Sequence, residues 1–583
     1  MQFMERVIRN SKIADDCGIL IEYNIPATSK RVDFIVTGQD EYGNNNFIIV
    51  ELKQWDSAKA TDREDVVLAC VGGKEREMTH PSYQAWSYRQ YLEDMNEAVQ
   101  SHQLRSYSCA YLHNYRTPQP DPLQSKQYQP IIQKSPLFLS EDTFKLQEFI
   151  RKHTGQGNGI NLLYLIENGK IRPSKKLIDH IDGLFKGNAE FTLLDEQKIA
   201  YESILSAAKD IAKKKTVIVK GGPGTGKSVI SMNALGGLLK HKLNVKFVAP
   251  NASFRSAMVE TLVKQQPKNK TRARNLFVGS GQFFDSPSDF FDVLIVDEAH
   301  RLKGKGAYMY QGENQIEDII KASKVNVFFI DDFQRIRPDD IGTVEEIKRI
   351  ARLNGSEVLE YALSAQFRCS GAEGFLNWID HIFQIRETGN FNGWDQDVFQ
   401  FVLMDSPHTV YDHIKEKVHE GCKARMLAGY AWNWTDAKNG NPNGEIEDVD
   451  IPEHQFKMPW NGRALSTWAI DERGVEQIGC VHTSQGLEFD YVGVIIGNDL
   501  KYDPSEKRIY ADYEEYKDKL GKKGLKNDNQ QLTKLIKNIY KVLISRGMKG
   551  CFLYCRNPEL QAYLKAQWGR ILMMDAQSET QSI

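Results

Sequence analysis

After residue 190, short apolar runs alternate along the chain with stretches in which apolar residues recur at helical spacing. The run at 216–219 predicts a buried parallel strand, because such a strand is covered on both faces and carries few polar residues. Apolar residues then return every three or four positions from Val229, which predicts a helix. Alternating strands and helices predict parallel sheets covered by helices. The other strands expected in this part are 244–250, 292–296, 324–330, 358–362, 424–430, 477–481, 491–496 and 551–554.

The chain before residue 190 follows a different pattern. Helical spacing over 1–13 is followed by strand candidates at 19–23, 31–36 and 47–52, and later by another at 107–112. A turn rich in Gly and Asn separates the second and third candidates, which predicts an antiparallel hairpin. The N-terminal part is therefore expected to be an α/β domain with its own sheet.

The fold class that follows is α/β, with several domains in one chain. At 583 residues the chain has room for three or four domains of ordinary size. We expect an N-terminal α/β domain over 1–185, a parallel-sheet domain over 186–368 and another over 369–575. A linker is expected at 183–188, and the polar segment 576–583 is expected to be disordered.

Composition narrows the class of protein. A net charge of −2 gives no overall field, so it argues neither for nor against a nucleic-acid partner. The eight cysteines are scattered and form no CxxC pair, which disfavours structural zinc and a disulfide framework and favours a reducing cytoplasm. The N-terminus does not resemble a signal peptide, and no apolar run reaches membrane-spanning length. We expect a cytoplasmic protein.

The pattern GxxxxGK[ST] is complete between the predicted strand at 216–219 and the helix that follows. Glycines allow the backbone to form a nest of N–H groups that binds a polyphosphate, and the helix N-terminus adds its dipole. Lys227 supplies a mobile positive charge, and the Ser228 hydroxyl can bind Mg²⁺. The alternative is a chance glycine-rich turn, which the flanking strand and helix disfavour. The predicted nucleotide-binding residues are Gly221, Gly222, Pro223, Gly224, Thr225, Gly226, Lys227 and Ser228.

Two acids follow the apolar strand at 292–296. Parallel strands end at one edge of a sheet, so Asp297 is expected at the same edge as the glycine-rich loop. There it can bind Mg²⁺ through water, while Glu298 can align and polarise a hydrolytic water. The pair therefore predicts hydrolysis of the bound nucleotide.

Acidic and basic residues also meet on the predicted N-terminal hairpin. Asp33 lies on one strand, and Glu51 and Lys53 lie at the end of the next. Strand alternation places Glu51 and Lys53 on one face. Two carboxylates can hold one or two Mg²⁺ ions, and a neighbouring lysine can orient or deprotonate a water. The alternative is an ordinary salt bridge.

The stretch RVDFIV…NFIIVELKQW resembles the PD-(D/E)xK nuclease superfamily, and the helix with Gln84-Ala-Trp-Ser-Tyr88 resembles the QxxxY motif of its recombination-exonuclease branch. The resemblance implies a Mg²⁺-dependent endonuclease or exonuclease with a restriction-endonuclease-like fold. It makes Asp33 and Glu51 metal ligands and Lys53 catalytic, and it places Gln84 and Tyr88 against the nucleic acid. The first-helix acid of that superfamily would be Glu5.

Residues 190–575 resemble the superfamily 1-like motor of bacterial DUF2075 proteins, which is shared with the Schlafen-type helicase domain and has two RecA-like domains. The resemblance rests on the strings DEAH, DDFQ, LSAQFR, HTSQGLEFD and YKVLISRG. It assigns ATP contacts to Gln197, Gln334 and Glu488, catalytic charge to Arg368 and an arginine finger at Arg546, and nucleic-acid contacts to Thr483 and Gln485.

The full chain resembles a nuclease–helicase fusion of that family. We expect an ATP-dependent helicase or translocase fused to a Mg²⁺-dependent nuclease, acting on DNA rather than RNA, with ATP and Mg²⁺ as cofactors and no membrane partner. Some relatives act in anti-phage defence, which leaves room for a defence partner protein or a homo-oligomer. The alternative is a nucleic-acid-sensing ATPase switch whose N-terminal domain binds but does not cut. The short spacing between the motifs leaves little room for the large insertions of processive helicases, so the sequence supports ATP hydrolysis more strongly than strand separation.

Three further segments have no assigned chemistry. The basic stretch 264–274 fits either solvated surface or phosphate contact. Trp432, Trp434 and Trp460 surround a Gly/Asn-rich loop, and packing is expected ahead of base stacking. The densely charged segment 501–527 is expected to be an exposed insertion.

Overall fold

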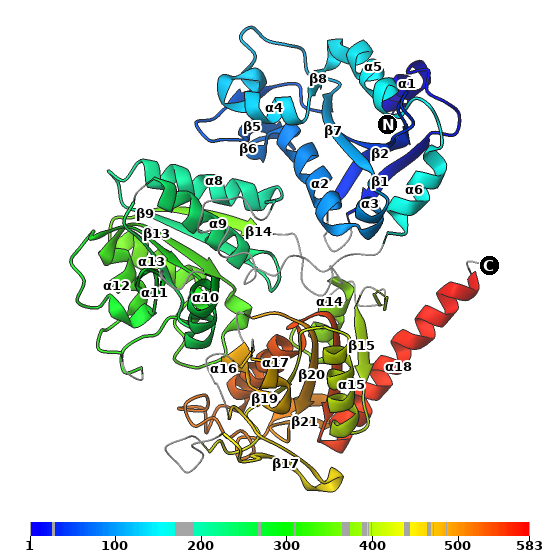
Figure 1. Ribbon diagram of the computed structural model, residues 1–583. Coiled ribbons are helices and arrows are strands. Elements are labelled where there is room, and N and C mark those ends of the chain that lie inside the picture. The colour runs from blue at the N-terminus through cyan, green and yellow to red at the C-terminus, as the bar shows by residue number, and fades with distance from the viewer. Residues whose placement is uncertain are drawn as a thin grey trace.

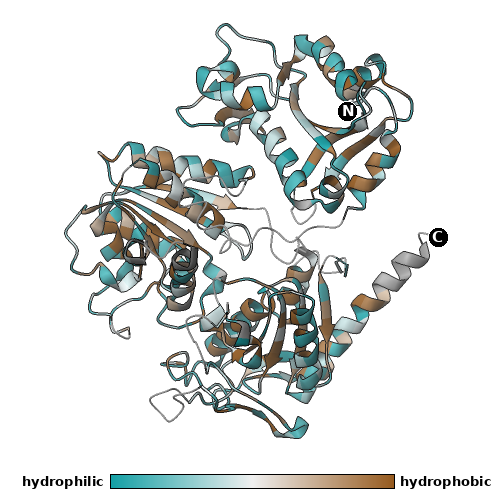
Figure 2. Cartoon of the chain, in the orientation of Figure 1, coloured by the Kyte–Doolittle hydropathy of each residue, from teal (hydrophilic) through white to brown (hydrophobic). Residues whose placement is uncertain are grey.

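The three largest sheets, with the helices that cover them, lie in three separate regions of the computed structural model (Figure 1). Figure 2 shows apolar residues concentrated on the strands and hydrophilic residues on the outer faces of the helices. The predicted α/β class is therefore correct. The structure describes residues 2–25, 30–169, 192–241, 243–265, 270–307, 310–363, 373–386, 393–394, 396–397, 399–435, 444–462, 468–469, 471–484 and 487–581.

The N-terminal sheet has the order β1-β2-β3-β7-β8. The pair β2–β3 is antiparallel, as the hairpin pattern predicted; β1–β2 is also antiparallel, while β3–β7 and β7–β8 are parallel. A separate antiparallel sheet, β4-β5-β6, was not predicted. The strands are β1 Gly18–Asn24, β2 Arg31–Gln39, β3 Asn45–Lys53, β4 Ala58–Ala60, β5 Val66–Val71, β6 Lys74–Thr79, β7 Arg105–Leu112 and β8 Leu137–Leu139.

Helices cover both faces of this sheet. On one face, α1 (Gln2–Asn10) and α5 (Thr143–Thr154) pack against Phe34 and Val50. On the other face, α2 (Pro81–Met95) and α6 (Gly159–Glu167) pack against Ile35 and Ile49. Neighbouring residues of a strand point to opposite faces, so Glu51 lies on the face that α2 covers.

The first of two all-parallel sheets has the order β11-β10-β12-β13-β9-β14, and with its helices we call it the first lobe. Helices α8 to α11 cover one face, and α12 and α13 cover the other. Its strands are β9 Lys215–Gly221, β10 Val245–Val248, β11 Phe277–Val278, β12 Phe291–Val296, β13 Ser323–Ile330 and β14 Glu357–Leu363. Its helices are α8 Glu196–Lys209, α9 Lys227–Lys240, α10 Ala252–Gln265, α11 Lys270–Leu276, α12 Gln315–Ala322 and α13 Val344–Leu353.

The second lobe is built on the parallel sheet β15-β23-β20-β16-β19. Its sheet strands are β15 Gln400–Leu403, β16 Ala424–Ala428, β19 Ile478–Gly479, β20 Phe489–Ile496 and β23 Gly547–Cys555. Its helices are α14 Glu373–Ile382, α15 Pro407–His419, α16 Val481–Ser484, α17 Asn529–Ile544 and α18 Pro558–Gln581. Two hairpins lie outside this sheet: β17 Val449–Ile451 with β18 Phe456–Met458, and β21 Leu500–Asp503 with β22 Arg508–Ala511.

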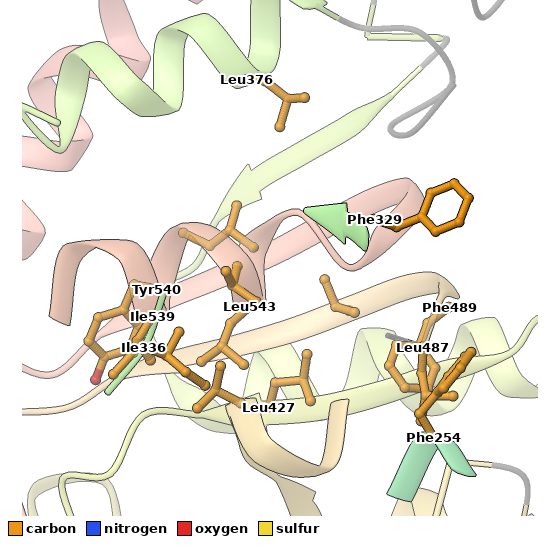
Figure 3. Packing of buried hydrophobic residues seen from close by; sticks show 14 of the residues in the cluster. Phe254, Phe329, Ile336, Leu376, Leu427, Leu487, Phe489, Ile539, Tyr540 and Leu543 are labelled. Carbon is orange, nitrogen blue, oxygen red and sulfur yellow. The ribbon is translucent and has the colours of Figure 1, made fainter. Parts of the chain in front are cut away.

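One hydrophobic core joins the two lobes. Figure 3 shows Ile336 of the first lobe in one cluster with Ile539 and Tyr540 of α17, and Phe254 of α10 with Leu487 of the second lobe. Apolar contact of this kind stabilises one relative position of the two sheets. The edges of the two lobes are therefore held close together.

Several expectations differ from the structure. The segment 501–527 is not an exposed insertion, because it forms β21 and β22 and buries Tyr516 and Leu525. The segment 576–583, expected to be disordered, is helical as far as Gln581 in α18. Trp460 and Trp432 are buried in the core of the second lobe, as packing predicted, while Trp434 is 38% exposed. The predicted linker at 183–188 lies outside the described residues.

Candidate functional site

The predicted phosphate-binding loop lies between β9 and α9. Lys227 Nζ donates hydrogen bonds to the backbone oxygens of Gly221 (2.8 Å) and Gly222 (2.7 Å), which keeps its ammonium group against the loop. The Thr225 hydroxyl donates to the Gly222 oxygen at 3.0 Å. Gly224 has a φ of 77°, a backbone conformation that glycine adopts without steric cost. The loop therefore has the backbone of an anion-binding nest at the start of a helix.

Gln197, the predicted adenine contact, packs directly on this loop. Its Nε2 donates to the Thr225 backbone oxygen at 3.0 Å. Gly226 has a φ of 83°, which strains any residue with a Cβ, and a Cβ atom there would lie 2.3 Å from the same Nε2 and displace the end of the Gln197 side chain. Gln197 is thus fixed beside the candidate nucleotide site.

Asp297 and Glu298 follow β12 at the edge where the loop lies. Burial, together with the charge of Glu298, raises the pKa of Asp297 above its ordinary value, while the Ser228 hydroxyl and Lys227 act in the opposite direction. Glu298 has a φ of 54°, in the left-handed region that is strained for residues with a side chain, and such strain is found at functional sites. Its Oε2 lies 3.1 Å from His300 Nε2. The two acids and the loop are brought together as predicted.

Arg546 lies at the end of α17 and reaches from the second lobe to the first. Its Nε and Nη1 donate to the backbone oxygens of Val542 (3.2 Å) and Leu487 (3.3 Å). Its Nη2 lies 3.4 Å from the Oε1 atom of Gln334, a residue in the turn that follows β13. Gln334 Nε2 donates to Asp331 Oδ2 at 2.8 Å. The predicted arginine finger and the predicted γ-phosphate sensor are therefore in contact with each other.

The remaining predicted residues of the two lobes have separate environments. Thr483 is buried on α16, where its hydroxyl accepts the Cys480 backbone N–H at 2.9 Å. Glu488 is exposed at the start of β20. Arg368 and Gln485 lie outside the described residues. Of the basic side chains in 264–274, that of Arg274 is described, and it is exposed on α11.

A second contact between the lobes was missed by the sequence analysis. Arg337 Nη2 lies 3.1 Å from His482 Nε2, and the same His482 nitrogen lies 3.1 Å from Asp518 Oδ2. Burial lowers the pKa of His482 to about 4, although Asp518 opposes this. Asp518 belongs to the charged segment that was expected to be exposed, so composition alone concealed its role.

The predicted acidic site of the N-terminal domain is also assembled. Lys53 Nζ lies 2.8 Å from Glu51 Oε1, and the Leu52 backbone N–H donates to Asp33 Oδ2 at 2.8 Å. The antiparallel hairpin register pairs Phe34 with Val50, so Asp33, one residue before Phe34, and Glu51, one residue after Val50, come next to each other at the adjacent position of the two strands. Burial raises the pKa of Glu51 above its ordinary value, against the effect of Lys53. We call Asp33, Glu51 and Lys53 the acidic site.

Helix α2 brings the predicted nucleic-acid residues to the same face. Gln84 Nε2 donates to the Tyr88 hydroxyl at 2.9 Å, and that hydroxyl donates to Asp195 Oδ2 at 2.7 Å. Asp195 was not predicted to be part of any site. Glu5 lies on α1, which covers the opposite face of the sheet, and forms an ion pair with Arg9. It is therefore not placed to join the acidic site.

Glu51 of the acidic site and Asp297 of the nucleotide site each have a carboxylate oxygen that is available to a divalent cation. Glu51 Oε2 and Asp297 Oδ2 are buried and accept no hydrogen bond from the described part of the chain. Within the same ranges, no group of three or more His, Cys, Asp and Glu side chains is arranged to hold a metal ion. Mg²⁺ commonly takes one or two carboxylates and completes its shell with water and phosphate oxygens, so both positions fit Mg²⁺ of that kind.

These features define a class: an α/β protein with a P-loop on one parallel sheet and, on a second parallel sheet, an arginine that reaches toward the first. The chain belongs to the Schlafen group 3 helicase-domain family, because the sequence model described as "Schlafen group 3, DNA/RNA helicase domain" matches residues 214–557, more than half of the chain. The Schlafen-type resemblance is thereby confirmed, and residues 214–557 form a helicase-like domain.

Several known proteins are similar to parts of this chain in sequence or in structure. The uncharacterized protein YPL245W of Saccharomyces cerevisiae is 30% identical over 300 residues, which are 47% of this chain and 64% of that protein. The Pif1 helicase from Candida albicans is similar in structure over 64% of this chain and 98% of its own, at 12% identity and a TM-score of 0.27. Domain III of the replication initiation protein DnaA from Thermotoga maritima covers 28% of this chain and 61% of its own, at 15% identity and a TM-score of 0.17. In the described ranges, no helix is both long and apolar enough to cross a membrane.

Proposed function

We propose that this protein is an ATP-dependent helicase or translocase whose N-terminal domain is a Mg²⁺-dependent nuclease. The observation that carries the proposal is the contact between Arg546 of the second lobe and Gln334 of the first, beside the loop that bears Lys227. An arginine supplied from a second domain can stabilise the charge that develops on the phosphates of a nucleotide bound to the first. We propose the domain boundaries 1–185, 186–368 and 369–575, because each range contains the strands of one of the three largest sheets.

In the ATP site each side chain has a distinct task. Lys227 and the loop N–H groups bind the β- and γ-phosphates, and Gln197 contacts the base. Glu298 accepts a proton from the attacking water, and His300 Nε2 lies 3.1 Å from its Oε2. Arg546 stabilises negative charge that develops in the transition state. Mg²⁺, held by Ser228 and Asp297, would neutralise phosphate charge.

In the acidic site Glu51 and Asp33 would hold Mg²⁺, which would polarise the phosphodiester and the attacking water. Lys53, 2.8 Å from Glu51 Oε1, is placed to orient that water through its ammonium group. Gln84 lies on the same face and would contact the nucleic acid, while Tyr88, predicted as a second contact, is 2% exposed and supports Gln84 from the core. This supports cutting of a phosphodiester bond, by an endonuclease or an exonuclease.

A second candidate function is a sensing switch that hydrolyses ATP but does not cut. The observation in its favour is that Lys53 is ion-paired to Glu51 and that Asp33 accepts the Leu52 backbone N–H, which are contacts that also stabilise a hairpin. A domain in which these residues have structural roles alone would still bind nucleic acid.

The test is a time course with end-labelled linear, circular and single-stranded DNA and with RNA, in Mg²⁺ or Mn²⁺, with and without ATP. We expect wild type to cut DNA and Lys53→Ala to lose cutting while its ATPase rate stays within about twofold, because Lys53 lies on β3 of the N-terminal sheet and is not part of the phosphate-binding loop. Lys59→Ala is the matched control, since Lys59 pairs with Glu75 at a side-chain exposure of 70%. If wild type cuts no substrate under any of these conditions, the sensing switch replaces the nuclease.

The biological setting is proposed from the resemblance to DUF2075 nuclease–helicase proteins. We propose a cytoplasmic role in antiviral defence, with DNA as the preferred substrate and with a homo-oligomer or a defence partner protein left open. Phage should form fewer plaques on bacteria that express the wild-type protein than on bacteria that express Lys227→Ala. Equal plaque numbers across a panel of phages would count against a defence role.

A further inference from the structure

Residues 193–197 connect the N-terminal domain to the first lobe. Leu193 is buried in the core that the two lobes share, and the next residue, Leu194, is buried in the core of the N-terminal domain beside Tyr88. The Tyr83 hydroxyl of α2 also donates to the Leu193 backbone oxygen at 2.8 Å. Because adjacent residues are held in different cores, this segment cannot shift without disturbing contacts on both sides.

One end of the segment lies on the phosphate-binding loop. Gln197 Oε1 accepts the Leu194 backbone N–H at 3.1 Å, while its Nε2 donates to the Thr225 backbone oxygen at 3.0 Å. One side chain thus joins the loop to the backbone of the segment. A change in the position of the loop or of Gln197 is therefore transmitted to Leu194 and Asp195.

The other end lies against Tyr88 of α2, on the face of the N-terminal sheet that carries Glu51 of the acidic site. Asp195 Oδ2 accepts the Tyr88 hydroxyl at 2.7 Å and lies 3.2 Å from Lys30 Nζ. Asp195 Oδ1 is buried and has no hydrogen-bond partner among the described residues.

The backbone at Asp195 is strained. Its φ is 37° and its ψ is −107°, a conformation that residues with a Cβ rarely adopt. Strain of this kind persists where surrounding contacts hold it, and here the contacts come from the two neighbouring leucines, Tyr88 and Gln197. A change in any of these contacts would remove what holds the strained conformation in place.

We propose that residues 193–197 couple the nucleotide site to the acidic site, with Asp195 as a positioning residue that holds the Tyr88 hydroxyl. The proposal rests on the proposed function, because it takes the P-loop to bind ATP and the acidic site to cut nucleic acid. Coupling requires a ligand to favour one arrangement of a shared element. Gln197 supplies the contact on the nucleotide side, and Asp195 supplies the contact on the nuclease side.

The first experiment measures nucleotide affinity and does not depend on cutting. Tyr88→Phe removes the hydrogen bond to Asp195, so under the proposal it shifts the position of the shared segment and with it the affinity of the P-loop for nucleotide. We expect Tyr88→Phe to change the Kd for a fluorescent ATP analogue by about fivefold. Tyr23→Phe is the control: Tyr23 is buried in the same core, and its hydroxyl donates to the Ile166 backbone oxygen at 3.4 Å, away from the segment. A change below about twofold in Tyr88→Phe, or an equal change in Tyr23→Phe, would overturn the proposal.

The second experiment measures DNA cutting with and without a non-hydrolysable ATP analogue. We expect the analogue to change the wild-type rate by about fivefold and the Asp195→Ala rate by less than about twofold. Asp195→Asn keeps an oxygen that accepts the Tyr88 hydroxyl and should retain the response. Glu196→Gln is the control, as it removes a neighbouring charge that pairs with Lys30. An undiminished response in Asp195→Ala would refute the coupling.

The two experiments separate the possible failures. If wild type cuts no DNA, the nuclease assignment fails, and the affinity measurement alone decides whether the segment couples the two domains. If wild type cuts but the analogue changes its rate by less than about twofold, the nuclease assignment stands and the coupling is refuted. Circular dichroism of each variant establishes that it is folded before either result is interpreted.

Discussion

Replacing Arg546 should slow ATP hydrolysis without weakening nucleotide binding. The side chain is 1% exposed and is held in its own lobe by the backbone oxygens of Val542 and Leu487. Its remaining terminal nitrogen lies 3.4 Å from Gln334 Oε1 across the gap between the sheets. Such an arrangement orients the positive charge before the transition state forms, so the charge stabilises the transition state more than bound ATP.

The expected magnitude depends on the replacement. Arg546→Ala removes the charge, and arginine fingers contribute roughly 10³ to 10⁵ in kcat. Arg546→Lys keeps a charge but cannot keep the planar set of donors that reaches three oxygens. A hydrogen bond to a charged group contributes about 1.5–3 kcal/mol, so the loss of one corresponds to a fall of roughly 10- to 100-fold. In each variant the Kd for ATP should change by less than about threefold, since little of this charge is needed in the ground state.

The assay is steady-state ATP turnover at saturating nucleic acid, combined with nucleotide affinity. Gln334→Ala and the double variant complete a double-mutant cycle, and residues that act as a unit give a double variant about as slow as Arg546→Ala alone. Arg349→Ala is the matched control, because Arg349 pairs with Glu346 on α13 at a side-chain exposure of 58%. Loss of affinity with unchanged kcat, or fully additive effects in the cycle, would refute the reasoning.

Three further outcomes are expected. Glu298→Gln should bind ATP normally while turnover falls by roughly 10² or more, and unchanged turnover would contradict its role as base. The logarithm of the association constant for nucleic acid should fall linearly with the logarithm of the salt concentration, as phosphate contacts require, and a slope of zero would exclude such contacts. Burial raises the pKa of Asp499 to about 7, so the folded state binds a proton more tightly than the unfolded state, and stability falls as pH rises from about 4 to about 7. Asp499→Asn should therefore raise the melting temperature more at pH 8 than at pH 5, and an equal shift at both pH values would show that Asp499 is not the cause.

The sequence predicted best those features that depend on neighbouring residues. Strands of the two parallel sheets are buried on both faces, so runs such as 292–296 are apolar throughout and were located to within a residue of β12. The loop from Gly221 to Ser228 has fixed spacing because its backbone must enclose a phosphate. The acidic site followed from the hairpin pattern, since Asp33 precedes Phe34 and Glu51 follows Val50 in an antiparallel pair, which brings the two acids to neighbouring positions.

Features set by a few buried residues in a polar stretch were not predicted. The segment 501–527 is charged on average, yet Tyr516 is 1% exposed and Asp518 pairs with His482. Composition over such a window records the solvated majority and not the residues that pack. Strand β6, Lys74–Thr79, was missed for the same reason, because its sequence KEREMT contains four charged residues and has little apolar alternation.

The buried charges that matter most for the candidate sites lie where separate parts of the chain meet. Arg546 contacts a residue 212 positions away, Tyr88 contacts Asp195 107 positions away, and His482 contacts Asp518 36 positions away. A buried charge without a partner costs several kcal/mol, so each of these groups favours the arrangement that brings its partner close. When these parts of the chain move apart, water hydrates the exposed polar groups. The free energy needed to separate the parts is therefore smaller than the free energy of leaving each buried group without a partner. A ligand that contacts one member of a pair can then shift the balance between the two arrangements, and for this reason we place the control of both candidate activities at these junctions.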